Sequence, residues 1–324
     1  MELQLHENTV TGSKQKLHTH NFGDVVFKNL LRFFAFLILA LVILMAYEMY
    51  ATSRLSIDKF GWHFFVTSIW DPVQKNFGAL PFIYGTLVSS FIALLIALPL
   101  SLGIAIFLSE IAPPFVEKPV SFLVELLAGI PSIVYGIWGF FVMVPWLRKS
   151  IEPGLSKYFG TLPLFQGAPY GVGMLAAGII LSIMILPIIT SISRDVLKAV
   201  PRSQKEAALA LGSTRWEATR IALSYARSGI IGATILGLGR ALGETMAVTM
   251  VIGNRPTISA SLLAPSYTMA SVLANEFTEA TSDMYISALI EIALALFIIT
   301  IIVNTFARLL VWAATKNSES FERL

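Results

Sequence analysis

Two charged side chains lie inside an otherwise apolar stretch of the chain. Arg240 and Glu244 are the only Asp, Glu, Lys or Arg residues of segment 228–253. A charge at mid-membrane costs about 2.5–3.5 kcal/mol on insertion scales, so both side chains are expected to face protein or water rather than lipid. Arginine presents a fork of donors that matches the geometry of phosphate and similar oxyanions. We therefore predict that Arg240 borders a water-filled path and attracts an anion.

Glu244 is expected to be the partner of Arg240. Two side chains spaced four residues apart in a helix share a face and can form an ion pair. The pair is formally neutral, which lowers the cost of insertion, and Glu244 would hold the guanidinium when the anion leaves. The alternative is a purely structural ion pair that locks helices together, beside a Gly239-x-x-x-Gly243 pattern typical of close helix packing.

A polar segment, 194–227, precedes this stretch and predicts two short helices outside the membrane. Pro201 and Ser203 suit the start of the first helix, and Glu206 would lie in its first turn, where a negative charge suits the helix dipole. Gly212 is expected to end that helix, and one of the two hydroxyl residues after it to cap the next. The alanines of the first helix present a narrow surface that a groove on a partner could receive. The alternative is an amphipathic connecting helix without a partner.

The elements that must hold these residues are six apolar blocks. Each is long enough to cross a bilayer core as a helix, which takes roughly 20 residues. The blocks span residues 33–49, 82–109, 120–147, 170–193, 228–253 and 285–312. We interpret the first as an uncleaved signal anchor, because its polar lead is long and no small-x-small cleavage site follows it. The predicted fold is an all-α integral membrane protein with six transmembrane helices.

The blocks divide the chain into four regions with a predicted orientation. These are a cytoplasmic N-terminal tail (1–28), the first span with its outer loop (29–76), a five-span core (77–313) and a cytoplasmic C-terminal tail (314–324). Lys and Arg concentrate in inner segments of membrane proteins. With the N-terminus inside, most of the 23 Lys and Arg residues fall on the inner side. We therefore expect both termini in the cytoplasm, although the outer loop 148–169 has basic residues of its own.

Composition excludes several classes of protein. Hydrophobic residues make up 56% of the chain and charged residues 13%, with a mean hydropathy of +0.74, whereas a soluble domain is about one-quarter charged. Because there is no cysteine, disulfides and Cys-ligated metals are excluded. No Walker A sequence, dinucleotide fingerprint or zinc motif occurs. We predict no catalytic residue, metal or cofactor on this chain. Glu125 and Glu291, acids within apolar blocks, are interpreted as locally paired structural groups.

The polar segment carries a family resemblance. Glu206-Ala207-Ala208-x-x-x-Gly212 resembles the EAA loop of bacterial ABC importer permeases. The resemblance implies that this loop forms a coupling helix seated in a cleft of a cytoplasmic ATPase, which would use the ATP. Ser224 stands where the family pattern has proline, which puts the entry into the next span in question.

A more specific resemblance surrounds Arg240. Segment 236–248, Leu-Gly-Leu-Gly-Arg-Ala-Leu-Gly-Glu-Thr-Met-Ala-Val, closely resembles the PstC family of phosphate-specific permease subunits. Further similar segments are 127–139 and 285–291, and the resemblance covers about residues 77–313. It implies that Arg240 and Glu244 are linked to phosphate passage. It also implies the type I ABC importer permease fold with a cytoplasmic coupling helix.

The resemblance further implies a set of partners. A permease subunit of an ATP-driven inorganic phosphate importer would pair with a second, PstA-like permease subunit. A PstB-like ATPase dimer would bind on the cytoplasmic side and a PstS-like phosphate-binding protein on the outer side. The location would be the bacterial cytoplasmic (inner) membrane, and no nucleic acid is involved.

Three alternatives stand beside this interpretation. A permease of the same class could carry another oxyanion, such as molybdate or sulfate. A secondary transporter or channel would need no ATPase, and inverted repeats would favour it. An intramembrane enzyme would need a Ser/His, paired-Asp or His-Glu-x-x-His arrangement, and the sequence has none of these.

Overall fold

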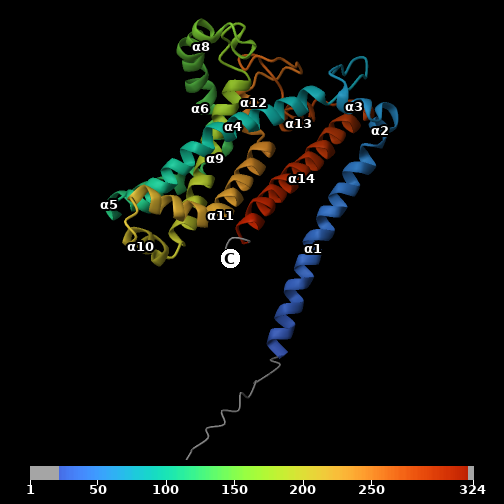
Figure 1. Ribbon diagram of the computed structural model, residues 1–324. Coiled ribbons are helices and arrows are strands. Elements are labelled where there is room, and N and C mark those ends of the chain that lie inside the picture. Colours follow the sequence, from blue (N-terminus) through green and yellow to red (C-terminus); the bar gives the residue numbers. More distant parts are fainter. Residues whose placement is uncertain (1–21, 320–324) are drawn as a thin grey trace, which may run out of the picture. The chain divides into compact units, whose positions relative to one another are not determined.

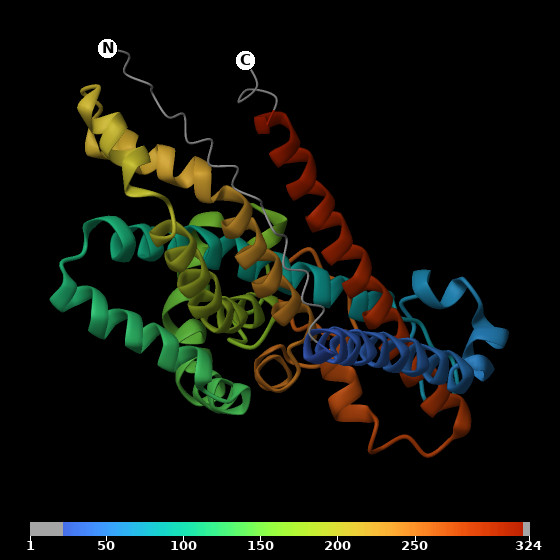
Figure 2. The ribbon, with the colours of Figure 1, turned by 90° about the horizontal axis from the view of Figure 1, so that it is seen from below.

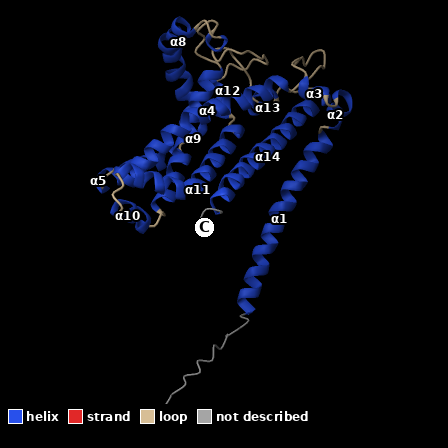
Figure 3. Cartoon of the chain, in the orientation of Figure 1, coloured by secondary structure: helices blue, strands red, loops and turns tan. Residues whose placement is uncertain are grey.

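The fold is built from helices joined by loops (Figure 3). The structure, a computed structural model, describes residues 22–319, with Phe22, Asp24 and residues 310–319 as backbone only. Within that range there is no strand, only an isolated bridge between Asp71 and Asn76. The predicted all-α fold is therefore confirmed. Most of the predicted N-terminal tail and the last residues of the C-terminal tail lie outside the described residues.

The first half of the chain holds these helices: α1 (Phe22–Thr52), α2 (Arg54–Phe60), α3 (His63–Val66), α4 (Leu80–Ile106), η1 (Phe107–Ile111), α5 (Pro114–Gly129), α6 (Ser132–Trp138), η2 (Gly139–Met143), α7 (Val144–Trp146), η3 (Leu147–Ile151), α8 (Glu152–Phe159) and η4 (Pro163–Phe165). The second half holds α9 (Met174–Lys198), α10 (Arg202–Ala210), α11 (Arg215–Gly243), α12 (Met246–Val251), α13 (Met269–Glu276) and α14 (Asp283–Glu319).

The chain divides into two compact units, residues 1–48 and 49–324. The described part of the first unit is most of α1, an apolar helix long enough to cross a bilayer. In the second unit, α10 and α5 lie at one end, and α8 and α13 at the other (Figure 1). The view from below shows α10 and the start of α11 at the periphery of this unit (Figure 2).

Helix α9 is the centre of the second unit. Many of its apolar side chains, including Ile180, Ile185 and Ile189, are fully buried, and α4 and α11 pack along it. A Cβ added to Gly178 of α9 would come within 2.4 Å of the Ile92 side chain on α4. Glycine is therefore required for this close approach of α4 to α9.

A second core lies beside α13 and the start of α14. It is rich in aromatic rings: Phe64, Phe77, Phe82, Tyr267 and Tyr285 are buried together. The carboxylate of Glu276 accepts hydrogen bonds from the Trp70 indole (2.7 Å) and the Tyr285 hydroxyl (2.6 Å). These bonds attach the loop before α4 to α13 and α14.

The predicted number of spans agrees with the structure. Five described helices are long and apolar enough to cross a membrane, and a sixth span results if the bent pair α5 and α6–α8 is counted as one. The helix ends differ from the predicted blocks, as in α9, which runs from Met174 to Lys198 rather than from residue 170 to 193. The predicted region boundaries at residues 28, 76 and 313 stay predictions.

The third predicted span, 120–147, is not one continuous helix. Helix α5 ends at Gly129, and the next helix begins at Ser132 after a bend of 94°. Pro131 has no N–H to donate and restricts the residue before it, and Ile130 is accordingly extended. The proline therefore interrupts the span rather than only kinking it.

The fifth predicted span, 228–253, is wrong at both ends. Helix α11 begins at Arg215 and ends at Gly243, and the short α12 follows after a break at Glu244 and Thr245. The early start has a local cause, since Thr214 and Glu217 form a capping box. At the break, the Glu244 backbone is extended and its carboxylate accepts a 3.4 Å hydrogen bond from the Ala247 N–H.

Candidate coupling surface and transport path

After α9, the chain folds as a short helix, α10, and a glycine turn that leads into α11. Pro201 precedes α10, and Gly212 follows it with φ +88°, a left-handed conformation that favours glycine. The Ser213 N–H donates to the Ala208 carbonyl (3.1 Å) and the Gly212 N–H to the Leu209 carbonyl (3.0 Å). This is the Schellman pattern of helix termination. The predicted stop at Gly212 is confirmed.

The second helix is capped as predicted but is not short. The Thr214 N–H donates to the Glu217 carboxylate (2.7 Å), and the Glu217 N–H donates to the Thr214 hydroxyl (3.3 Å). From this box α11 runs without interruption to Gly243. Ser224 lies inside that continuous helix, so the missing family proline leaves α11 unbroken there.

The position of Glu206 corrects another expectation. Helix α10 begins at Arg202, so Glu206 lies beyond the first turn. The first turn itself contains no acidic residue. Glu206 and Ala207 are exposed, whereas Ala208 is buried against the protein. Leu211 is 88% exposed and Trp216 is 65% exposed. An exposed apolar rim beside small side chains is typical of a surface that another protein covers.

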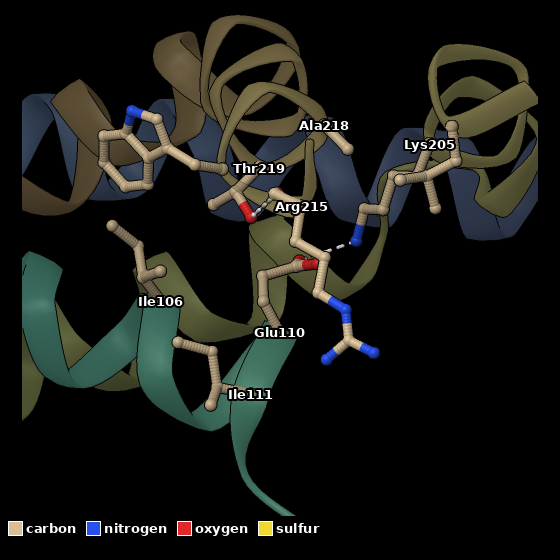
Figure 4. A pocket seen from close by; sticks show the side chains of 9 residues that line it. Ile106, Glu110, Ile111, Lys205, Arg215, Ala218 and Thr219 are labelled. Carbon is tan, nitrogen blue, oxygen red and sulfur yellow. Dashed lines mark hydrogen bonds and ion pairs between the residues drawn. The ribbon is translucent and has the colours of Figure 1, made fainter. Parts of the chain in front are cut away.

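One ion pair attaches α10 to the end of α4. Lys205 Nζ lies 2.6 Å from the Glu110 carboxylate in η1. The pair borders a cavity of about 510 Å³ whose other walls are mainly apolar (Figure 4). The remaining lining residues are Ile106, Ile111, Leu209, Arg215, Trp216, Ala218 and Thr219.

Two further ion-pair groups join α5 to the last turns of α9. Arg194 Nη2 lies 3.1 Å from the Glu125 carboxylate and 2.8 Å from that of Asp195. Lys198 pairs with Glu117. The structure thus gives Glu125 the local partner that was predicted.

Arg240 and Glu244 do not form the predicted ion pair. Residues four positions apart share a face only in one continuous helix, but α11 ends at Gly243. No ion pair joins these two described side chains. Arg240 lies in the last turn of α11, where a cation is favoured by the helix dipole, and it is exposed on the chain. Glu244 is half-buried. Each side chain therefore remains available to another partner.

The two helix breaks lie close together in space. Helix α6, which follows the break at Pro131, packs on α12, which follows the break at Glu244. A Cβ added to Gly136 would lie 2.7 Å from Met250 Sδ and 3.1 Å from Ala247 Cα. Tyr135, beside this contact, is near enough to Arg240 for electrostatic interaction.

The sequence prediction missed this contact between α6 and α12. Its signal is the spacing of Gly136 in α6 and Gly139 at the start of η2, because Gly139 also approaches Val251 of α12. In a membrane, non-helical backbone is tolerated where it is buried in protein or lines a water-filled cavity. Two adjacent breaks beside an exposed arginine therefore favour a polar path at this place.

Glu291 differs from the expected locally paired acid. It lies in α14 and is only 2% exposed. It forms no ion pair with a described residue, and its Oε2 atom has no hydrogen-bond partner among them. Helices α2, α11 and α13 all pack against α14. Glu291 thus has no charged partner among the described residues, but the Ser56 side chain of α2 interacts with its carboxylate.

Residues 101–314 match the family described as binding-protein-dependent transport system inner membrane component. The match covers α9 to α12, including the glycine turn at Gly212 and the break at Glu244. The chain belongs to this family. It is therefore a transport component and a multi-pass membrane protein, as the all-helical fold and apolar spans also indicate.

Members of the family with high similarity are permeases of phosphate transport systems. Phosphate transport system permease protein PstC of Mesorhizobium japonicum is 49% identical over 88% of this chain and 89% of the relative. PstC of Pasteurella multocida is 46% identical over 92% of this chain and 94% of the relative. The probable PstC of Methanocaldococcus jannaschii is 41% identical over 77% of this chain and 81% of the relative. A solved structure of the MetNI methionine ABC transporter in inward-facing conformations has a TM-score of 0.48 at 18% identity, covering 71% of this chain and 90% of that one.

Proposed function

We propose that the chain is the membrane-spanning permease subunit of an ATP-driven inorganic phosphate importer. The observation that carries the proposal is the 49% identity to a phosphate transport permease over 88% of the chain. The family membership supports the transport class, and the arginine at the paired helix breaks supports an anionic cargo. A second, PstA-like permease subunit would complete the translocation path.

Arg240 is proposed to act on the anion through its charge. The guanidinium is exposed on this chain, beside the breaks that end α5 and α11. Inside a subunit pair with low effective dielectric, an arginine offsets much of the cost of holding phosphate away from water.

Coupling to ATP is proposed to run through α10. Glu206 and Ala207 form its exposed face, Ala208 anchors the opposite face, and Gly212 fixes the turn. This surface would sit in a cleft of a PstB-like ATPase dimer, which binds and hydrolyses ATP. The chain itself would carry no ATPase site, cofactor or metal.

The remaining partners and the location follow from the same proposal. A PstS-like binding protein would deliver phosphate from outside, next to the end of the molecule that holds α8 and α13. The chain would lie in the bacterial inner membrane with both termini in the cytoplasm. Transport would then alternate between a path open to the binding protein and one open to the cytoplasm.

Labelled-phosphate uptake by cells tests the path. Arg240→Gln removes the charge at the breaks while keeping a polar side chain of similar length, and uptake is expected to fall at least about tenfold, as for a lost charge-assisted contact worth about 1.5–3 kcal/mol. Arg148→Gln, an exposed arginine in η3, is the matched control and should leave uptake unchanged. Normal uptake by Arg240→Gln at wild-type membrane levels would refute the path role.

The same assay separates the oxyanion alternatives. Uptake of labelled phosphate should persist in the presence of excess sulfate or molybdate and be abolished by unlabelled phosphate. If sulfate or molybdate competes and phosphate does not, the chain belongs to an importer of another oxyanion.

A further inference from the structure

Helix α10 has few attachments to the rest of the protein. Of its nine residues only Ala208 is buried, and its main helix contact is with α11, to which Gly212 joins it. Lys205 is the one α10 residue, all of them described, whose side chain forms an ion pair. That pair is the link between α10 and the end of α4.

The pair is shielded from water. The Lys205 side chain is 20% exposed and that of Glu110 12%, and they face the mainly apolar cavity beneath α10 (Figure 4). Ion pairs at exposed sites contribute little, because water and salt screen them. A shielded pair is stronger, and removing one member leaves the other charge without compensation.

The partner of Lys205 lies in an unusual helical turn that follows α4. Glu110 belongs to η1, a π-helical turn that continues α4. π-Helical turns are rare and often lie at functional sites. Helix α4 packs along α9, and α9 packs on α11, whose last turn holds Arg240. A displacement of Glu110 would therefore act on helices that pack around the candidate path.

The other described ion pairs have a different role. Arg194 with Glu125 and Lys198 with Glu117 join α9 to α5 and do not involve α10. They provide matched controls, because they lie at the same end of the molecule but bypass α10.

We propose that Glu110 and Lys205 are positioning residues that make α4 move together with α10 during transport. The inference rests on the proposed function, in which α10 receives the movement of the ATPase. Without the pair, α10 would still follow the ATPase and pull on α11, but α4 would lag behind. ATP would then be hydrolysed with less phosphate moved.

The test uses the assembled importer in liposomes, with phosphate uptake and ATP hydrolysis measured on one preparation. Glu110→Gln and Lys205→Met should each lower the phosphate moved per ATP at least about fivefold, the lower end of coupling between linked sites. The ATPase should still copurify with both variants. The double exchange Glu110→Lys with Lys205→Glu should restore the ratio toward the wild-type value, whereas Glu117→Gln should leave it unchanged.

Two results would overturn the proposal. One is an unchanged ratio of phosphate to ATP in both single variants. The other is a double exchange that inserts normally in the membrane yet couples no better than the single variants. If the pair had a purely structural role, its loss would lower the protein level, ATP hydrolysis and phosphate uptake together. The amount of phosphate moved per ATP would then stay unchanged.

A distance measurement keeps the proposal testable if uptake cannot be measured. The chain has no cysteine, so spin labels can be placed at Ser203→Cys in α10 and Leu100→Cys in α4, both exposed. With cysteine-free partner chains, the label distance should keep one distribution throughout the ATP cycle, and in Glu110→Gln it should broaden or split. Equal distributions in both proteins would refute the link. Phosphate is not needed here, so failure of the proposed cargo is distinguishable.

Discussion

Gly212 shows how one residue can set the presentation of α10. Its φ of +88° is strained for any side chain, although a Cβ there would meet no atom within 4 Å. We expect Gly212→Ala to cost about 1–2 kcal/mol through this backbone strain. The turn would shift to relieve it, and α10 would lose its orientation. Copurification of the ATPase with the permease should therefore fall.

Substitution of a second glycine distinguishes the effect of backbone strain from the effect of losing a glycine. Gly232, inside α11, also has open space around its Cβ position but an ordinary helical φ. Gly232→Ala should leave ATPase copurification unchanged, since alanine favours a helix. If Gly212→Ala binds the ATPase as well as Gly232→Ala does, the turn does not present the coupling surface.

The contact between α6 and α12 is the element on which the candidate path depends. A Cβ at Gly136 would approach Ala247 Cα to 3.1 Å, a backbone atom that cannot move aside. Overpacking of this kind typically costs about 1–3 kcal/mol. We expect Gly136→Ala to lower the unfolding temperature in detergent and to reduce phosphate uptake, because the two short helices are forced apart.

The control for this prediction lies at the end of α5. A Cβ at Gly129 meets nothing within 4 Å, so Gly129→Ala should preserve both stability and uptake. Because Met250 is the other close neighbour of Gly136, Met250→Ala should restore part of the loss. Equal unfolding temperatures for Gly136→Ala and Gly129→Ala would contradict the tight contact.

The helices could be predicted from the sequence where local chemistry determines them. Apolar blocks located the spans, and Gly212 and the hydroxyl after it located the turn between α10 and α11. The break at Glu244 could not be predicted in this way, because no proline marks it. It is stabilised by packing of α12 on Gly136 and Gly139, residues more than a hundred positions earlier. The predicted Arg240–Glu244 pair failed for the same reason.

At the scale of the whole molecule, the two ends of residues 49–324 have different features. One end holds α10, α5 and their ion pairs, and the other holds α8, α13 and the aromatic core. The basic segment 194–227 lies at the first end, and its excess of Lys and Arg predicts that this end faces the cytoplasm. Segment 148–169 at the other end is also basic, so the orientation requires a direct test.

The absence of cysteine makes that test clean. A membrane-impermeant thiol reagent applied to intact spheroplasts should label Thr161→Cys, which is exposed after α8, and should not label Ser203→Cys in α10. After permeabilisation both should react, which shows that each introduced thiol is accessible. The reverse pattern would place α10 outside, where no ATPase could reach it. It would refute the cytoplasmic coupling surface while leaving the helix packing unchanged, because orientation depends on loop charge and packing on apolar contacts.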